Sequence, residues 1–231
     1  SVQHKRPCLE IPLDVGGRFS VLSPVGLVVA SFLDLDLDQI KSGAMNALGD
    51  TKNLNTMCNQ FLSSFERAES ITLFWFYCSR LRWFGGWIQQ LWAESLGKKN
   101  DRQGNPAFSF STPMTSIGAC DQHSILQQVV DGPKNKFVCV FRFLDIERKS
   151  VVIHQPIFKD TQSMKGKQFG DLLKAEALAT QKGLHLSNVS TMLFEFEHFN
   201  PETLGYLFMS FQIVVATLAE IKNINAFDQP G

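Results

Sequence analysis

Residues 71–78 read ITLFWFYC, and this stretch decides the fold class of the chain. β-branched and aromatic residues favour strands, and here they follow one another without the alternation of polar and apolar residues that a half-exposed strand shows. A strand that is apolar on both faces is typical of a parallel sheet covered by helices. We therefore expect residues 71–78 to form a buried strand of such a sheet.

The rest of the chain alternates similar apolar runs with amphipathic stretches. Further strands are predicted at residues 107–111, 136–144 and 191–196, with a partner strand at 150–153. Alternating strands and helices predict an α/β fold, a three-layer α/β/α sandwich with a mostly parallel, Rossmann-like sheet. Its site is expected where strands end and loops lead into helices. The helical patterns cover residues 19–32, 37–48, 53–68, 82–96, 124–130, 169–181 and 201–224.

The composition is that of an ordinary globular protein. A chain of 231 residues with 44% hydrophobic residues can bury one sizeable core or two small ones. The formal net charge of zero argues against a nucleic-acid or anionic-membrane surface. The sequence shows no signal-peptide pattern, and we expect no segment that spans a bilayer.

The five cysteines are scattered along the chain and include no C-x-x-C pair. This usage is typical of a reducing compartment, so we expect a cytoplasmic protein and neither a disulfide scaffold nor a zinc site. Cys78 and Cys139 lie in apolar runs and are expected to be buried. Because the chain starts at Ser1 and stops at Gly231 soon after the last helical pattern, we expect a fragment or one domain of a longer protein.

Gly16, Gly17 and Arg18 form the first candidate site element. Two glycines allow backbone torsions that are closed to other residues and let the chain approach a ligand. The guanidinium that follows them carries a permanent charge and five hydrogen-bond donors. The alternative is an ordinary turn with a surface arginine.

Glu94 is the second candidate. On a helix, Gln90 and Glu94 are four residues apart and share a face, and Trp87, Leu91 and Trp92 provide apolar surface nearby. A carboxylate in low-polarity surroundings is a stronger base, which suits proton abstraction. The alternative is an exposed glutamate near the end of a helix.

His123 is the third candidate, because an imidazole can take up and release protons near neutral pH. It follows a Ser/Thr-rich stretch, residues 111–116, which we interpret as a turn that caps a helix or holds an anion at its start. On its own the histidine can equally be structural. Glu195, Glu197 and His198 lack the spacing of metal ligands, so we expect no metal site.

Together these elements resemble glucose-6-phosphate isomerases. The pattern G-G-R-[FY]-S-V-x-S-x-V-G-L matches residues 16–27, Q-L-W-x-E-S-x-G-K matches residues 90–98, and [GD]-Q-H-[SA] matches residues 121–124. Three such motifs in this order are specific, and the similarity runs over nearly the whole chain. The resemblance is to the second sugar-isomerase (SIS) domain of the family, in its bacterial form.

The resemblance implies an aldose–ketose isomerase of glycolysis and gluconeogenesis that uses no metal or organic cofactor. Glu94 would move a proton between C2 and C1 of the sugar phosphate through a cis-enediol, and Arg18 would stabilise the negative charge that develops. His123 is implied in ring opening and would reach the site from the partner subunit, so a homodimer is implied. Gln90 and Gly17 would contact the substrate.

Parts of the family pattern are missing from residues 1–231. We expect these residues to form a single SIS domain with an N-terminal lead-in and a long C-terminal helix. The first SIS domain, with its phosphate-binding loop, and the lysine that follows D-Q-x-G would lie outside the chain. The isolated chain is therefore expected to be almost inactive. The main alternative is a non-catalytic, sugar-phosphate-binding SIS module, and a third is a purely structural assembly domain.

Overall fold

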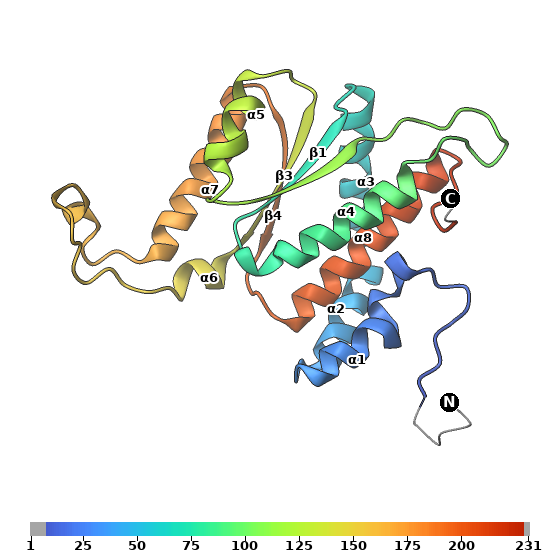
Figure 1. The fold of residues 1–231 in the computed structure, drawn as a ribbon, viewed down its shortest axis with the longest axis horizontal. Helices are drawn as coiled ribbons and strands as arrows, with labels where there is room; N and C mark the ends of the chain where they lie inside the picture. Colours follow the sequence, from blue (N-terminus) through green and yellow to red (C-terminus); the bar gives the residue numbers. More distant parts are fainter. Residues whose placement is uncertain (1–7, 229–231) are drawn as a thin grey trace. The chain divides into compact units, whose positions relative to one another are not determined.

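The computed structural model describes residues 8–228 (Figure 1). Internal contacts divide the chain into two compact units. The first unit comprises the residues up to Cys58, Gln90–Phe108 and the residues from Asn200 onward, and the second comprises Asn59–Gln89 and Ser109–Phe199. The assignment of residues 1–231 to a single SIS domain stays a prediction.

The second unit contains a four-stranded sheet in which every neighbouring pair is parallel (Figure 1). Its strands are β1 (Ile71–Phe76), β2 (Thr112–Ile117), β3 (Lys136–Phe143) and β4 (Ser190–Phe196), arranged in the order β2-β1-β3-β4. The strand predicted at residues 71–78 thus lies in the interior of the sheet. The predictions of an α/β class and a parallel sheet are confirmed.

Helices of the second unit cover both faces of this sheet. On one face, Leu73, Trp75 and Tyr77 pack in a buried cluster with Val129 of α5 (Gln127–Asp131) and with Ala177 and Leu184 of α7 (Phe169–Leu186). The other face is aromatic. The rings of Phe76 and Phe141 lie 4.7 Å apart, and those of Phe141 and Phe194 lie 4.4 Å apart.

Two long helices supply the cover on this aromatic face. Phe61 of α3 (Thr51–Glu66) packs edge-on against Phe137, and Phe84 of α4 (Arg82–Leu96) packs edge-on against Phe76. Cys139 is fully buried, as its apolar run indicates, and Cys78 is buried too. The three-layer α/β/α arrangement follows, because both sheet faces are apolar and each needs a helical layer.

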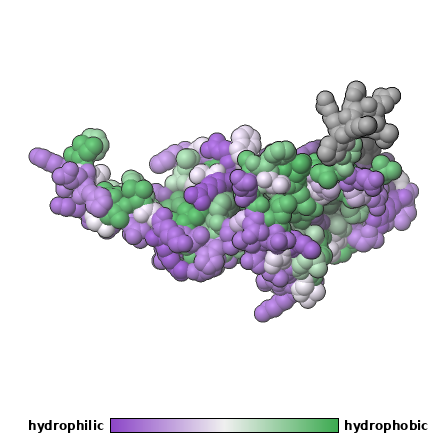
Figure 2. Space-filling model, turned by 90° about the horizontal axis from the view of Figure 1, so that it is seen from below, coloured by the Kyte–Doolittle hydropathy of each residue, from purple (hydrophilic) through white to green (hydrophobic). Residues whose placement is uncertain are grey.

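A long connection joins β3 to β4 in the second unit. It contains α6 (Leu144–Arg148), the short helical turn η5 (Lys159–Met164) and α7. A similar short turn, η3 (Ser79–Leu81), follows β1. Apolar side chains lie on the surface of the connection, and Figure 2 shows them as green atoms at one end of the view. Ile157 is the most exposed of them, at 89%.

The first unit is helical. It contains the short turn η2 (Gly17–Leu22) and the helices α1 (Pro24–Phe32), α2 (Leu37–Gly49) and α8 (Pro201–Ile221), with the first part of α3 and the last part of α4. Side chains cap these helices. Asp36 accepts a hydrogen bond from the backbone N–H of Gln39 at the start of α2, and Asn200 accepts one from Thr203 at the start of α8.

Helices α2 and α8 pack closely because glycines face each other across their contact. A Cβ atom on Gly205 would lie 2.0 Å from the backbone oxygen of Ile40, and one on Gly43 would lie 1.8 Å from that of Glu202. These distances are shorter than any van der Waals contact, so a side chain at either position would force the helices apart. The two glycines therefore set the distance between α2 and α8.

Helix α8 is long and apolar enough, by length and composition, to cross a membrane, which the sequence analysis did not expect. Half of its apolar window is buried inside the protein. Leu207, Phe211, Val214 and Leu218 are almost completely buried. Because a helix that is apolar nearly all round suits a protein core as well as a bilayer, we interpret α8 as the core helix of the first unit.

The strands predicted at residues 107–111 and 150–153 are wrong. The edge strand is β2, in which the N–H groups of Thr112 and Gly118 donate to Ser70 and Phe76 of the neighbouring chain segment. Pro113 lies within this strand although proline has no N–H to donate. An edge strand tolerates it, because alternate N–H groups point away from the sheet. Residues 150–153 form only an isolated bridge between Val152 and Gln168.

Several predicted helix boundaries are also wrong. The helix expected over residues 19–32 is interrupted at Ser23, whose backbone is extended and whose hydroxyl caps α1, which starts at Pro24. Helix α7 runs to Leu186 and does not end at residue 181, and α8 ends at Ile221 and not at residue 224. Asn188 then adopts a φ of 55°, and the N–H of Val189 donates to Leu184, as at many helix ends.

We predict opposite effects for two glycine-to-alanine substitutions within helices. Gly205→Ala should destabilise the chain by about 2 kcal/mol or more, because its methyl group overlaps the backbone of α2. Gly183→Ala is the matched control, since nothing lies within 4 Å of its Cβ position, and it should stabilise by up to about 1 kcal/mol. Urea unfolding measures both. Equal effects would contradict the close approach of α2 and α8.

Candidate active site

The turn η2 carries Arg18 and is held by two side-chain hydrogen bonds. The hydroxyl of Ser20 donates to the carbonyl of Gly17 at 2.7 Å, which closes the turn. The side-chain amide of Gln212 on α8 donates to the carbonyl of Phe19 at 2.9 Å. The backbone around Arg18 is therefore fixed to the core helix of its unit.

The glycine-specific conformation expected at Gly16 and Gly17 is not found. Gly16 has a φ of −66°, which any residue can adopt. Neither glycine is among the described residues with positive φ. At Gly17, however, nothing lies within 4 Å of a Cβ position, so the backbone there is open on that side. Its expected substrate contact stays a prediction.

The Arg18 side chain is buried, with an exposed fraction of 2%. Its Nε donates to the hydroxyl of Ser95 at 2.8 Å, and its Nη2 donates to the carbonyls of Ala226 and Asp228 at 2.5 and 2.7 Å. A buried charge is tolerated only when it is hydrogen-bonded on several sides, and these contacts meet that need. The alternative of a surface arginine is excluded.

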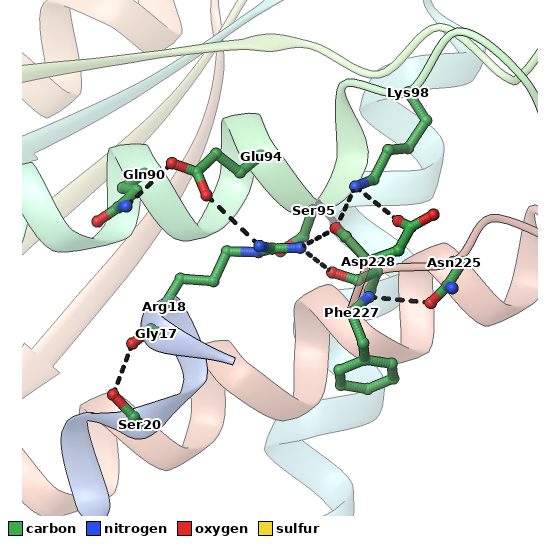
Figure 3. A network of polar contacts seen from close by, with 11 residues as sticks. Gly17, Arg18, Ser20, Gln90, Glu94, Ser95, Lys98, Asn225, Phe227 and Asp228 are labelled. Atoms are coloured by element: carbon green, nitrogen blue, oxygen red, sulfur yellow. Dashed lines mark hydrogen bonds and ion pairs between the residues drawn. The ribbon is translucent and has the colours of Figure 1, made fainter. Parts of the chain in front are cut away.

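Glu94 lies beside this guanidinium. Its Oε2 accepts from Nη1 of Arg18 at 3.4 Å, and its Oε1 accepts from Nε2 of Gln90 at 2.9 Å (Figure 3). The expected spacing of Gln90 and Glu94 on one helix face is confirmed. The setting is more open than the sequence indicates: the Glu94 side chain is 35% exposed, whereas Leu91 and Trp92 point into the interior and are fully buried.

The arrangement suits proton transfer next to a developing anion. A carboxylate can accept a proton, and the guanidinium at 3.4 Å keeps its charge at any working pH. Gln90 orients the carboxylate through its other oxygen.

His123 belongs to the second unit. It lies in a wide, π-type turn, Gln122–Leu126, and its side chain is exposed. The expected Ser/Thr-rich turn before it is wrong, because Thr112, Thr115 and Ser116 are residues of strand β2. The turn that follows the strand is instead closed by Asp121, whose carboxylate accepts from the N–H of Ile117 at 2.6 Å.

A buried polar cluster fixes the turn that carries His123. Nε2 of Gln122 donates to the hydroxyls of Tyr77 and Thr180 at 2.7 and 2.6 Å, and Tyr77 donates to Thr180 at 2.8 Å. Burial raises the pKa of Tyr77 above its ordinary value. Gln122, the residue before His123, is thus hydrogen-bonded to the residue that follows β1 and to α7.

The acidic residues near the end of β4 are engaged in ion pairs. Glu195 pairs with Arg142 at 3.0 Å, Glu197 pairs with Arg148, and the carboxylate of Asp145 lies 3.8 Å from His198. Within residues 8–228, no three His, Cys, Asp or Glu side chains come together as metal ligands.

Sequence reasoning missed three residues of the site. Ser95 and Lys98 lie in the same motif as Glu94, and Asp228 begins the D-Q-x-G stretch at the end of the chain. Ser95 contacts Arg18 directly, and Lys98 forms an ion pair with Asp228 at 2.9 Å (Figure 3). Their positions within the motifs could have indicated that these three residues belong to the site. No periodicity in the sequence shows that they lie next to Arg18 or to one another.

Comparison with known sequences gives one consistent family. A family model described as phosphoglucose isomerase matches residues 7–231. A probable glucose-6-phosphate isomerase from Methanococcus maripaludis is 32% identical over 229 residues, which cover 96% of this chain and 50% of the relative. The glucose-6-phosphate isomerase of Campylobacter jejuni is 34% identical over 230 residues, covering 97% and 55%. The chain spans about half the length of the curated relatives it matches.

Comparison with solved structures agrees. A hypothetical protein from Thermus thermophilus superposes with a TM-score of 0.84 at 34% identity, over 96% of this chain and 54% of that one. A glucose-6-phosphate isomerase from Chlamydia trachomatis has a TM-score of 0.79 at 22% identity, over 95% and 45%, and supports the fold alone. The sheet, its two helical layers and these matches define an α/β sandwich fold. More specifically, the chain belongs to the phosphoglucose isomerase family.

We predict that Tyr77→Phe weakens the attachment of the turn that carries His123, because Gln122 loses a hydrogen-bond partner. Losing the hydroxyl should cost about 1–2 kcal/mol of stability at neutral pH, because two buried hydrogen bonds disappear. It should also flatten the pH dependence above about pH 10. In the wild type the unfolded tyrosine releases its proton first, because the pKa is raised in the folded state, so stability falls as the pH rises. Urea unfolding at pH 8 and pH 10.5 measures both effects. If the free energy of unfolding changes equally between the two pH values in wild type and variant, the buried position of the hydroxyl is contradicted.

Proposed function

We propose that the chain is the carboxy-terminal, catalytic part of a glucose-6-phosphate isomerase, which interconverts glucose 6-phosphate and fructose 6-phosphate. The observation that carries the proposal is the contact between the Glu94 carboxylate and the buried Arg18 guanidinium, 3.4 Å apart. The family match, and the names of the relatives that share about half their length with the chain, support it.

In the proposed reaction, Glu94 acts on the ring-opened sugar. Its carboxylate removes the proton from C2, and the electron pair left behind forms the C1–C2 double bond of a cis-enediol while the aldehyde oxygen takes up the negative charge. Arg18 stabilises this oxygen, an electrostatic effect that is often the largest contribution to catalysis. Return of the proton to C1, with transfer of a proton between the two oxygens, gives the ketone at C2.

Other groups complete the proposal. Gln90 and Gly17 contact the substrate, and His123 assists ring opening from the partner subunit of a homodimer. The reaction needs no metal or organic cofactor, and we place the enzyme in the cytoplasm, in glycolysis and gluconeogenesis. We further propose that residues 1–231 alone have little activity, since the phosphate-binding loop of the family belongs to its other SIS domain.

Glu94→Gln in the full-length protein tests the base. We expect kcat to fall by about 10³-fold, because the amide cannot accept the proton, while the affinity for the sugar phosphate changes only a few-fold. Glu220→Gln, which changes an exposed partner of Arg102 in the same unit, is the control and should leave turnover unchanged. A coupled assay and isothermal titration measure the two quantities. Retained turnover in Glu94→Gln would favour the alternative, a non-catalytic sugar-phosphate-binding module.

Mixing two inactive full-length variants tests the shared site. If His123 serves the partner subunit, a heterodimer of Glu94→Gln and His123→Ala contains one intact site of two, so the heterodimer should show about half of the wild-type activity. The variants are co-expressed with different tags, and the doubly tagged species is assayed. If this species is inactive while each parent still folds and dimerises, His123 does not act across the dimer.

A further inference from the structure

The segment after α8 runs past Arg18 and accepts two of its hydrogen bonds. The carbonyls of Ala226 and Asp228 both accept hydrogen bonds from Nη2 of Arg18, at 2.5 and 2.7 Å. Figure 3 shows the segment beside the arginine. Together with Ser95 at Nε, they fix the plane of the guanidinium. Nη1 is the group that this orientation directs toward Glu94.

The segment is itself held from two sides. Nζ of Lys98 donates to the carbonyl of Asp228 at 2.7 Å and pairs with its carboxylate at 2.9 Å. On the other side, the ring of Phe227 lies 4.9 Å from that of Phe19, the residue next to Arg18. The Lys98 side chain is 8% exposed, so its amino group is committed to this contact.

The charges of these groups are arranged in a particular way. Neutral carbonyls orient the Arg18 guanidinium without cancelling its charge, whereas the nearby carboxylate of Asp228 is paired with Lys98. The contact from Arg18 to Glu94, at 3.4 Å, is longer than a charge-assisted hydrogen bond of about 2.8 Å. The positive charge of Arg18 thus faces the Glu94 carboxylate and not that of Asp228.

We propose that Lys98 is a positioning residue: by binding Asp228 it holds the 226–228 backbone against Arg18 and keeps the Asp228 carboxylate from neutralising the arginine. The inference rests on the proposed function, in which Arg18 stabilises the enediolate. Without Lys98, the Asp228 carboxylate is left beside a buried cation, and attraction between the two draws the guanidinium away from Glu94. A misplaced catalytic group of this kind lowers kcat more than it changes KM.

The test uses the full-length protein and three variants. Lys98→Met should lower kcat by about 10- to 100-fold and change KM by less than about threefold, while Lys99→Met, at the exposed neighbouring lysine, should change neither. Lys98→Met with Asp228→Asn should recover part of the lost kcat, because no competing carboxylate remains. If the ion pair has only a structural role, the double variant should have a kcat no higher than that of Lys98→Met. That result, or a wild-type kcat in Lys98→Met, would overturn the inference.

A second readout does not depend on activity. Phenylglyoxal modifies exposed guanidinium groups, and peptide mass spectrometry follows the reaction at Arg18. We expect several-fold faster modification of Arg18 in Lys98→Met than in wild type or Lys99→Met. If the wild-type protein lacks isomerase activity, the proposed function fails, but faster labelling still supports the positioning contact. Unchanged labelling in a folded Lys98→Met variant rejects it.

Discussion

The burial of one permanent charge organises the first unit. A guanidinium with 2% of its side chain exposed needs hydrogen-bond acceptors on several sides. Arg18 finds them in the turn of α4 that carries Ser95, in the backbone that follows α8, and in Glu94. Three segments that are distant in the sequence must therefore meet at one point, and the close packing of α2 on α8 provides the scaffold on which they do so.

The second unit depends on a different constraint, an interior sheet that is apolar on both faces. Aromatic side chains in register across β1, β3 and β4 cover one face, and a cluster under α5 and α7 covers the other. The polar cluster of Tyr77, Gln122 and Thr180 lies next to this apolar interior, and its side chains form hydrogen bonds with one another. It anchors the turn of His123 to the sheet.

Much of the fold was predictable, and the errors have definite causes. The strand predicted at residues 71–78, observed at Ile71–Phe76, and the start of α8 at Pro201 follow from local residue patterns. Strand β2 was missed because Pro113 and three hydroxyl residues look like a turn, and only its edge position makes it a strand. The aromatic alternation at residues 107–111 instead reflects side-chain packing, as between Phe110 and Phe65.

The sequence alone determined the α/β class, the family motifs and the pairing of Gln90 with Glu94, because helix and strand periods and short spacings are local properties. The tertiary structure decided that Arg18 is buried, that Glu94 remains partly open, and that the chain after α8 closes around the arginine. These contacts join residues 76 and 208 positions apart. No local pattern encodes such a separation, since it is set by how whole helices pack and by the demand of a buried charge for acceptors.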